Sequence, residues 1–423
     1  MARTATSRAA RSTVPGGRRR PLSIPGRRAT SPVALIRRDP APAASRRPLS
    51  VLIAVPVLFV VLAAFTAACT TNSAGAGTAS TLPTVVARTL RNHVDTVLRD
   101  NHVPGAIVGV WVPGKGSWVA TRGVADRSTR RPIKAGDAVR IASITKSFVA
   151  TVVLQLRDDG RLRLTDHLSR WVPDFPQADA ITVRQLLNHT GGVYPYFDDA
   201  AFRQAIEADP LKVWTEDELI DIARGHGPLF EPGASWHYSD TGYILLQRIV
   251  EQVTGHGLPD VIRRRVLEPL GLKHTGFPST PALPAPHAHG YWQKPGTTGL
   301  TDVTRLDPSM ALGSGAMVST LDDLARWTRA VATGRLLSRS SHRLQLRGVR
   351  MSALTETRYG LGIFLTTDAV GGSGDIYGFN SAAYYYPKDR SVIVVLLNRC
   401  DMTKSVADPL LSWLHRSLVA YGL

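Results

Sequence analysis

Alternation of apolar and polar residues predicts a β-hairpin near the start of the folded region. Residues 106–112 and 117–122 are rich in valine, alanine and tryptophan, and the sequence Pro-Gly-Lys-Gly separates them at 113–116. A Pro/Gly turn between two such runs is a hairpin signal. Residues 85–99, which come before it, have the apolar spacing of an amphipathic helix. We therefore expect a helix followed by a hairpin.

The pattern becomes mainly helical from about residue 143 to residue 334, where Gly160 and Gly255 are expected to end helices. Strand patterns return at 359–364, 382–386 and 391–398, and an amphipathic pattern at 401–419 predicts a terminal helix. Strands at both ends of a helical region predict an α/β fold. It would contain an antiparallel sheet completed by the two termini, flanked by N- and C-terminal helices, with an inserted mainly helical lobe.

A long apolar run near the N-terminus predicts export. Residues 49–65 follow a basic arm and would form about 26 Å of helix, slightly less than a full membrane span. A basic region before an apolar stretch is typical of an export signal. The run ends in Thr66-Ala67-Ala68-Cys69, which resembles a bacterial lipobox. We expect lipidation at Cys69 and a location at the cell membrane or envelope, with cleavage elsewhere or an uncleaved anchor as alternatives.

These patterns divide the chain into a basic arm (1–47), a hydrophobic signal or anchor segment (48–68), a linker of small residues (69–83) and a folded domain (84–423). The net charge of +18 does not indicate a nucleic-acid partner, because the arm holds twelve arginines and a single acid, Asp39. The arm thus carries +11 and the remainder only +7, so no nucleic-acid partner is expected.

The chain has two cysteines, Cys69 and Cys400. If Cys69 is lipidated or removed, no internal disulfide can form, and the fold depends on its core. Cys400 comes shortly after a run of apolar residues and is expected to be a small buried hydrophobic residue.

Ser143 and Lys146 form the first candidate pair of catalytic residues. Ser143 lies where a strand-like run passes into a helix, so its backbone N–H would be free of intrahelical partners. Lys146, three residues later, would reach the Ser143 hydroxyl, and burial would favour the neutral amine that can take its proton. Alone, the pair could be a helix cap and a solvated lysine. Lys146 is, however, the only lysine of eight with a serine three positions earlier.

Two later segments could complete a site. Tyr238 and Asp240 precede an amphipathic helix, and a loop tyrosine can relay protons if nearby cations lower its pKa. The alternative for Tyr238 is a packed aromatic ring. The sequence Gly371-Gly372-Ser373-Gly374-Asp375 comes before a strand, where glycines allow a close approach to substrate and a backbone N–H can bind an oxyanion. By itself this segment is a glycine-rich turn.

The order and spacing of these three motifs resemble the serine β-lactamase and penicillin-binding-protein family. The similarity is greatest to class C β-lactamases and to D-alanyl-D-alanine carboxypeptidases and esterases of that type. It covers about residues 84–421, and further matching segments are 186–192, 269–272 and 313–325.

The resemblance implies a role for each matched residue. Ser143 would be the acylated nucleophile, Lys146 its base, and Tyr238 a second base and proton donor. The backbone N–H groups of Ser143 and Asp375 would form the oxyanion hole. His189 would lie in a loop lining the cleft, with fixing that loop by hydrogen bonds as its expected role. No metal or organic cofactor is implied.

Two departures from the family pattern affect the substrate. Asp240 stands where asparagine is usual, and an ionised carboxylate cannot donate to a substrate carbonyl. Gly372 stands where lysine or histidine is usual, so the segment Gly372-Ser373-Gly374 would bind substrate without a cation. We therefore expect an exported serine hydrolase acting on small esters or amides. The alternatives are a D-alanyl-D-alanine carboxypeptidase or β-lactamase, a catalytically silent cell-wall or ligand-binding protein, and a membrane-bound sensor.

Overall fold

The computed structural model describes residues 81–294, 296–402 and 404–423. The predicted arm, hydrophobic segment and nearly all of the linker, including Cys69, lie outside these ranges. Within them, no helix combines the length and the apolar character needed to cross a membrane.

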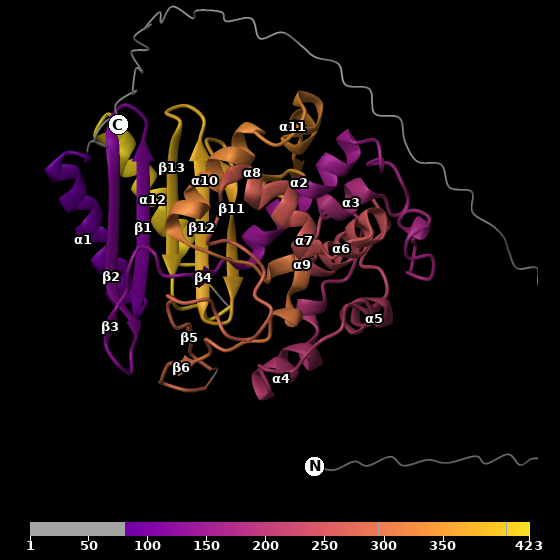
Figure 1. Cartoon of the computed structure of the whole chain (residues 1–423), viewed down its shortest axis with the longest axis horizontal. Coiled ribbons are helices and arrows are strands. Elements are labelled where there is room, and N and C mark those ends of the chain that lie inside the picture. Colours follow the sequence, from indigo (N-terminus) through magenta and orange to yellow (C-terminus); the bar gives the residue numbers. More distant parts are fainter. Residues whose placement is uncertain (1–80, 295, 403) are drawn as a thin grey trace, which may run out of the picture. The chain divides into compact units, whose positions relative to one another are not determined.

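Nine strands of the described region form one antiparallel sheet in the order β3-β2-β1-β13-β12-β11-β10-β9-β8 (Figure 1). Their bounds are β1 Gly105–Val112, β2 Gly116–Asp126, β3 Arg131–Pro132, β8 Val349–Arg350, β9 Arg358–Tyr359, β10 Phe364–Leu365, β11 Val370–Ile376, β12 Phe379–Tyr386 and β13 Ser391–Leu397. β1 pairs with β13, so the two ends of the domain meet at the centre of the sheet. This confirms the antiparallel sheet completed by both termini.

Helices cover both faces of the sheet. The N-terminal and C-terminal helices, α1 (Thr84–Asp100) and α12 (Ala407–Ala420), share a core with alternate residues of β1 and β13, whereas α10 (Leu321–Thr333) packs on the other face. Every residue of β13 is buried for this reason. Two-sided burial explains its unbroken apolar sequence.

The inserted lobe is mainly helical, as expected, and lies beside the sheet (Figure 1). Its longer helices are α2 Thr145–Asp158, α4 Ala200–Ala208, α5 Glu216–His226 and α6 Asp240–Thr254; the shorter ones are α3 Val183–Leu187, α7 Leu258–Ile262, α8 Glu268–Leu270, α9 Leu312–Gly315 and α11 Arg339–Gln345. The short strand pairs β4 (Val139–Arg140) with β7 (Val318–Ser319) and β5 (Tyr291–Trp292) with β6 (Thr301–Asp302) complete the elements. α2 is buried from Thr145 to Leu154, so it forms the centre of the lobe.

Three local predictions were wrong. The expected strand at 359–364 is two short strands separated at Gly360–Ile363, where Gly362 adopts a φ of +79° and packs against α2. The glycine-rich segment 371–375, expected to come before a strand, itself lies within a strand, β11, and the turn comes after it, at Gly378 with a φ of +86°. The last helix begins at Ala407 rather than near Asp401.

Candidate active site

Ser143 lies in a single 3-10 turn, Ala142–Ile144, that leads directly into α2. Two contacts hold this turn in place: the Ile141 N–H donates to Met317 O at 3.0 Å, and the Ser381 hydroxyl donates to Ile141 O at 3.1 Å. Ala142 adopts a left-handed φ of +48°, which is strained for a residue with a side chain. The nucleophile candidate thus sits on a constrained turn at the start of a buried helix.

Lys146 lies one turn into α2, and its side chain is only 1% exposed. Its Nζ donates to Ser143 Oγ at 3.1 Å, to Asp240 Oδ1 at 2.6 Å and to the backbone oxygen of Ser314 at 2.7 Å. Three acceptors match the three N–H donors of a lysine ammonium. The Lys146 side chain therefore points at three oxygen atoms from separate parts of the chain, among them the Ser143 hydroxyl.

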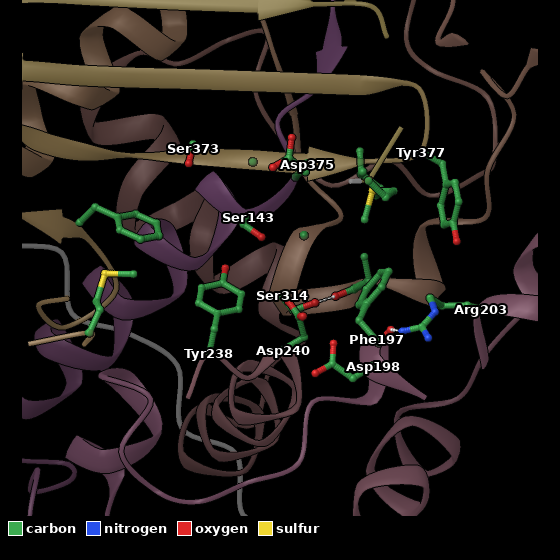
Figure 2. Close-up of a pocket in the computed structure, with 18 of the residues that line it drawn as sticks. Ser143, Phe197, Asp198, Arg203, Tyr238, Asp240, Ser314, Ser373, Asp375 and Tyr377 are labelled. Carbon is green, nitrogen blue, oxygen red and sulfur yellow. Dashed lines mark hydrogen bonds between the residues drawn. The ribbon is translucent and has the colours of Figure 1, made fainter. Parts of the chain in front are cut away.

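Tyr238 lies on the loop before α6, and its hydroxyl points toward Ser143 (Figure 2). The Lys146 Nζ lies 4.8 Å from the centre of its ring. The sequence argument required nearby cations to lower the pKa of Tyr238, and its surroundings act in the opposite direction. Burial, followed by the charge of Asp240, raises the pKa of Tyr238 well above its usual value, although a hydrogen bond with Ser143 opposes the shift. Tyr238 is therefore a neutral phenol at physiological pH.

Asp240 is the first residue of α6, and its carboxylate faces Lys146 rather than open solvent. Ser239 caps the helix, because its hydroxyl accepts from the Gly242 N–H. An acidic residue at a helix N-terminus is stabilised as a carboxylate. The Asp240 carboxylate is thus paired with the Lys146 side chain at the wall of the pocket.

His189 supports the tyrosine loop, as the sequence predicted. Its Nδ1 accepts from the Ser239 N–H at 3.2 Å, and its ring packs against Tyr238 and Tyr359 at 4.3 and 4.5 Å between ring centres. Burial and the charge of Lys146 lower the pKa of His189 well below its usual value, so the ring is neutral.

β11 brings its glycines against the turn Ala142–Ile144, which we call the nucleophile turn. A Cβ at Gly374 would lie 2.3 Å from Ile141 O and 2.8 Å from Ser143 N, so this position requires glycine. A Cβ at Gly372 would meet only Ile144 Cγ1, at 3.9 Å, so a side chain could fit there. The strand therefore approaches Ser143 closely at Gly374 and leaves room at Gly372.

Ser373 and Asp375 alternate with these glycines along β11. Ser373 contributes to the pocket wall, and its hydroxyl also hydrogen-bonds with Asp408. The Asp375 carboxylate accepts from the Asn380 amide and, at 3.5 Å, from the Cys400 thiol. Burial, together with the nearby Asp408, raises the pKa of Asp375 to about 6. Cys400 is buried, as expected.

A pocket of about 480 Å³ is lined by Ser143, Tyr238, Asp240, Ser373, Gly374 and Asp375 (Figure 2). The sequence analysis missed part of its wall, which includes Phe197, Asp198, Arg203, Trp236 and Phe364. Arg203 supplies a cation that the sequence did not indicate, and its guanidinium donates to Phe197 O at 2.9 Å. No local motif marks these residues, because they converge from a 3-10 turn, from α4, from the loop before α6 and from β10. Within the described ranges, no group of three or more histidine, cysteine or acidic side chains could hold a metal ion.

Comparison with known proteins agrees with this geometry. The sequence is 28% identical to penicillin-binding protein 4* of Bacillus subtilis over 301 residues, which cover 67% of this chain and 65% of that protein. It is 32% identical to esterase EstB of Burkholderia gladioli over 199 residues, which cover 44% and 50% of the two chains. The chain thus spans less than two thirds of the length of these relatives.

Solved structures show the same fold at similar identity. A D-stereospecific amidohydrolase from Streptomyces sp. superimposes with a TM-score of 0.68 at 32% identity, covering 74% of this chain and 94% of that one. A D-amino acid amidase from Ochrobactrum anthropi SV3 gives a TM-score of 0.68 at 26% identity, covering 79% and 100%. The profile of the Beta-lactamase family matches residues 87–414. With the family profile spanning most of the chain and the sheet, lobe and pocket arranged as described, this protein belongs to the beta-lactamase family of serine hydrolases.

Proposed function

We propose that the protein hydrolyses small esters or amides through an acyl-enzyme on Ser143. The observation that carries this proposal is the 3.1 Å contact between Lys146 Nζ and Ser143 Oγ at the wall of the pocket. A lysine at this distance can move a proton from the serine hydroxyl as it attacks. The Tyr238 hydroxyl, a neutral phenol beside Ser143, donates a proton to the leaving group.

The oxyanion of the tetrahedral intermediate would be held by the backbone N–H groups of Ser143 and Asp375. The support for this assignment is the closeness of β11 to the nucleophile turn, since a Cβ at Gly374 would lie 2.8 Å from Ser143 N. Paired backbone donors aimed at a developing charge make one of the largest contributions to catalysis in acyl transfer. Water then attacks the acyl-enzyme and releases the acid.

The proposed substrate carries no carboxylate near the scissile bond. Gly372, next to the pocket-lining Ser373 on β11, supplies no cation. Arg203 lies on the opposite wall beside Asp198 (Figure 2), and burial raises the pKa of Asp198 although the charge of Arg203 opposes the shift. A missing charge-assisted hydrogen bond costs about 1.5–3 kcal/mol, or roughly ten- to a hundredfold in binding.

The test is a hydrolysis panel with the wild-type protein and Ser143→Ala. The substrates are p-nitrophenyl esters, amino acid amides of both configurations, a D-Ala-D-Ala peptide and a chromogenic cephalosporin. We expect an ester or amide to be turned over fastest, and Ser143→Ala to lose at least about a thousandfold in kcat/KM. A fluorophosphonate probe should label wild type at Ser143.

Three contrary results would each overturn a different part of this proposal. Hydrolysis retained in Ser143→Ala would refute the nucleophile assignment. A preference for the cephalosporin or the D-Ala-D-Ala peptide would replace the proposed substrate by the β-lactamase or carboxypeptidase alternative. A folded wild-type protein that neither labels nor hydrolyses any substrate would support the catalytically silent binding protein.

A further inference from the structure

As an ammonium ion paired with Asp240, Lys146 would have no lone pair with which to accept the Ser143 proton. Its Nζ already donates to Ser143 Oγ, Asp240 Oδ1 and Ser314 O, at 2.6–3.1 Å. A backbone oxygen such as that of Ser314 is too weak a base to take a proton. The Asp240 carboxylate, at 2.6 Å, is the strongest base in contact with Nζ. In that state the Ser143 proton needs an acceptor other than Lys146.

We propose that Asp240 is the terminal proton acceptor for activation of Ser143, and that Lys146 relays the proton between them. This inference rests on the proposed function. Asp240 acts through Lys146 and does not touch the reacting carbonyl, so it is a positioning and proton-holding residue. An aspartate at this position, where asparagine is usual, therefore changes how Ser143 is activated and not only which substrates bind.

A proton transfer accompanies each bond that forms or breaks at the carbonyl carbon. The Ser143 O–H bond breaks as Oγ bonds to the carbonyl carbon; its proton bonds to Lys146 Nζ while another Nζ proton moves to Asp240 Oδ1. When the intermediate collapses, the bond from carbon to the leaving group breaks and Tyr238 protonates that group. Lys146 restores the Tyr238 proton and recovers its own from Asp240. The same steps with water in place of Ser143 release the acid.

Several other titratable groups surround the Lys146–Asp240 pair. The charged or titratable groups facing Lys146 and Asp240 are His189, Tyr196, Asp198, Tyr238, Tyr243 and Tyr359. Burial raises the pKa of each buried tyrosine well above its usual value and lowers that of His189 well below its own, so the tyrosines and His189 stay neutral at physiological pH. Asp375 on β11 is the neighbour whose pKa, about 6, could affect the pH profile.

The test is the pH dependence of single-turnover acylation with an activated ester, in wild type, Asp240→Asn and Asp375→Asn. If Asp240 accepts the proton, wild type stays active into the mildly acidic range, because a carboxylate loses its proton near pH 4 in water and a lysine near pH 10. In Asp240→Asn the acceptor must be a lysine amine. The acid limb should move toward alkaline pH by at least about one unit, with a loss of about tenfold or more at pH 6.

Asp375→Asn is the matched control, because it removes another carboxylate next to the nucleophile turn without touching Lys146. It should leave the midpoint of the acid limb in place, and only the midpoint is compared, because Asp375 also lines the pocket and supplies a backbone N–H to the proposed oxyanion hole. Asp240 is refuted as the acceptor if Asp240→Asn lowers the rate equally at every pH, if it raises the rate at neutral pH with no shift, or if Asp375→Asn alone moves the limb.

Asp240→Asn leaves a buried lysine without its counter-ion, a change that commonly costs about 3–5 kcal/mol and could unfold the variant. The wild-type profile then decides by itself: an acid limb already centred above about pH 8 would identify a lysine amine as the acceptor and overturn the inference. Fluorophosphonate labelling keeps the two proposals distinct. Wild type labelled at Ser143 but with the wrong profile contradicts only the role of Asp240, whereas unlabelled wild type contradicts the proposed function.

Discussion

At the residue scale, the site depends on buried charges whose partners come from different elements. Lys146 on α2 is neutralised by Asp240 on α6, and Asp375 on β11 is held by Asn380 on β12. A buried charge is tolerated when its hydrogen bonds are satisfied. The two acids differ, because the partner of Asp240 is a cation whereas the donors to Asp375 are neutral.

Asp375 should make folding stability depend on pH. Its pKa is raised from 3.8 to about 6, so the native state binds this proton more tightly than the unfolded chain. The stability that the group contributes is present below about pH 4 and is lost as pH rises to about 6, a change of about 3 kcal/mol. Asp375→Asn should remove this decline and be more stable than wild type at pH 7. Urea unfolding at several pH values measures it, and parallel curves for the two proteins would contradict it.

At the element scale, β11 and the nucleophile turn meet so closely that one methyl group would separate them. Gly374→Ala should lower kcat/KM by about a hundredfold, since a displacement of about 1 Å at a reacting group has that effect, and should cost about 1–3 kcal/mol of stability through overpacking. Steady-state kinetics and thermal unfolding measure both losses.

Gly372→Ala is the matched comparison, two residues away on the same strand and the same face. Its added methyl group would reach van der Waals distance of Ile144 and nothing closer, so both losses should be far smaller. Equal losses in the two variants would show that strand flexibility, and not the approach to Ser143, determines the effect.

The last helix shows how a distant residue sets the boundary of an element. Periodicity extends from residue 401, yet α12 begins at Ala407, because Asn380 Oδ1 on β12 accepts from the N–H groups of Val406 and Ala407 at 2.9 and 2.7 Å. A capping acceptor normally comes from the residue just before the helix. Here it comes from another strand, which local sequence cannot reveal.

At the scale of the whole molecule, we expect the N-terminal segments to have a role separate from that of the folded domain. We propose that residues 48–68 direct export and that Cys69 is lipidated, on the basis of the apolar run and the lipobox-like Thr66-Ala67-Ala68-Cys69. Cys69→Ser should then move the protein from the membrane fraction to the soluble fraction, measured by fractionation and immunoblotting. Unchanged partitioning in that variant would favour an uncleaved hydrophobic anchor instead.

The sequence by itself determined the antiparallel sheet, the helical lobe and the residues Ser143, Lys146, Tyr238 and Gly374 that converge at the pocket. These features follow from local signals: apolar residues spaced as in a strand or a helix, and motifs of fixed spacing. Such signals can be recognised without knowledge of the tertiary structure. Only the tertiary structure decided the charge state around the nucleophile. The Lys146–Asp240 pair joins residues 94 positions apart, and the pKa of Tyr238 follows from its burial beside them. Burial and electrostatic contact depend on which segments the fold brings together, so no local pattern could supply them.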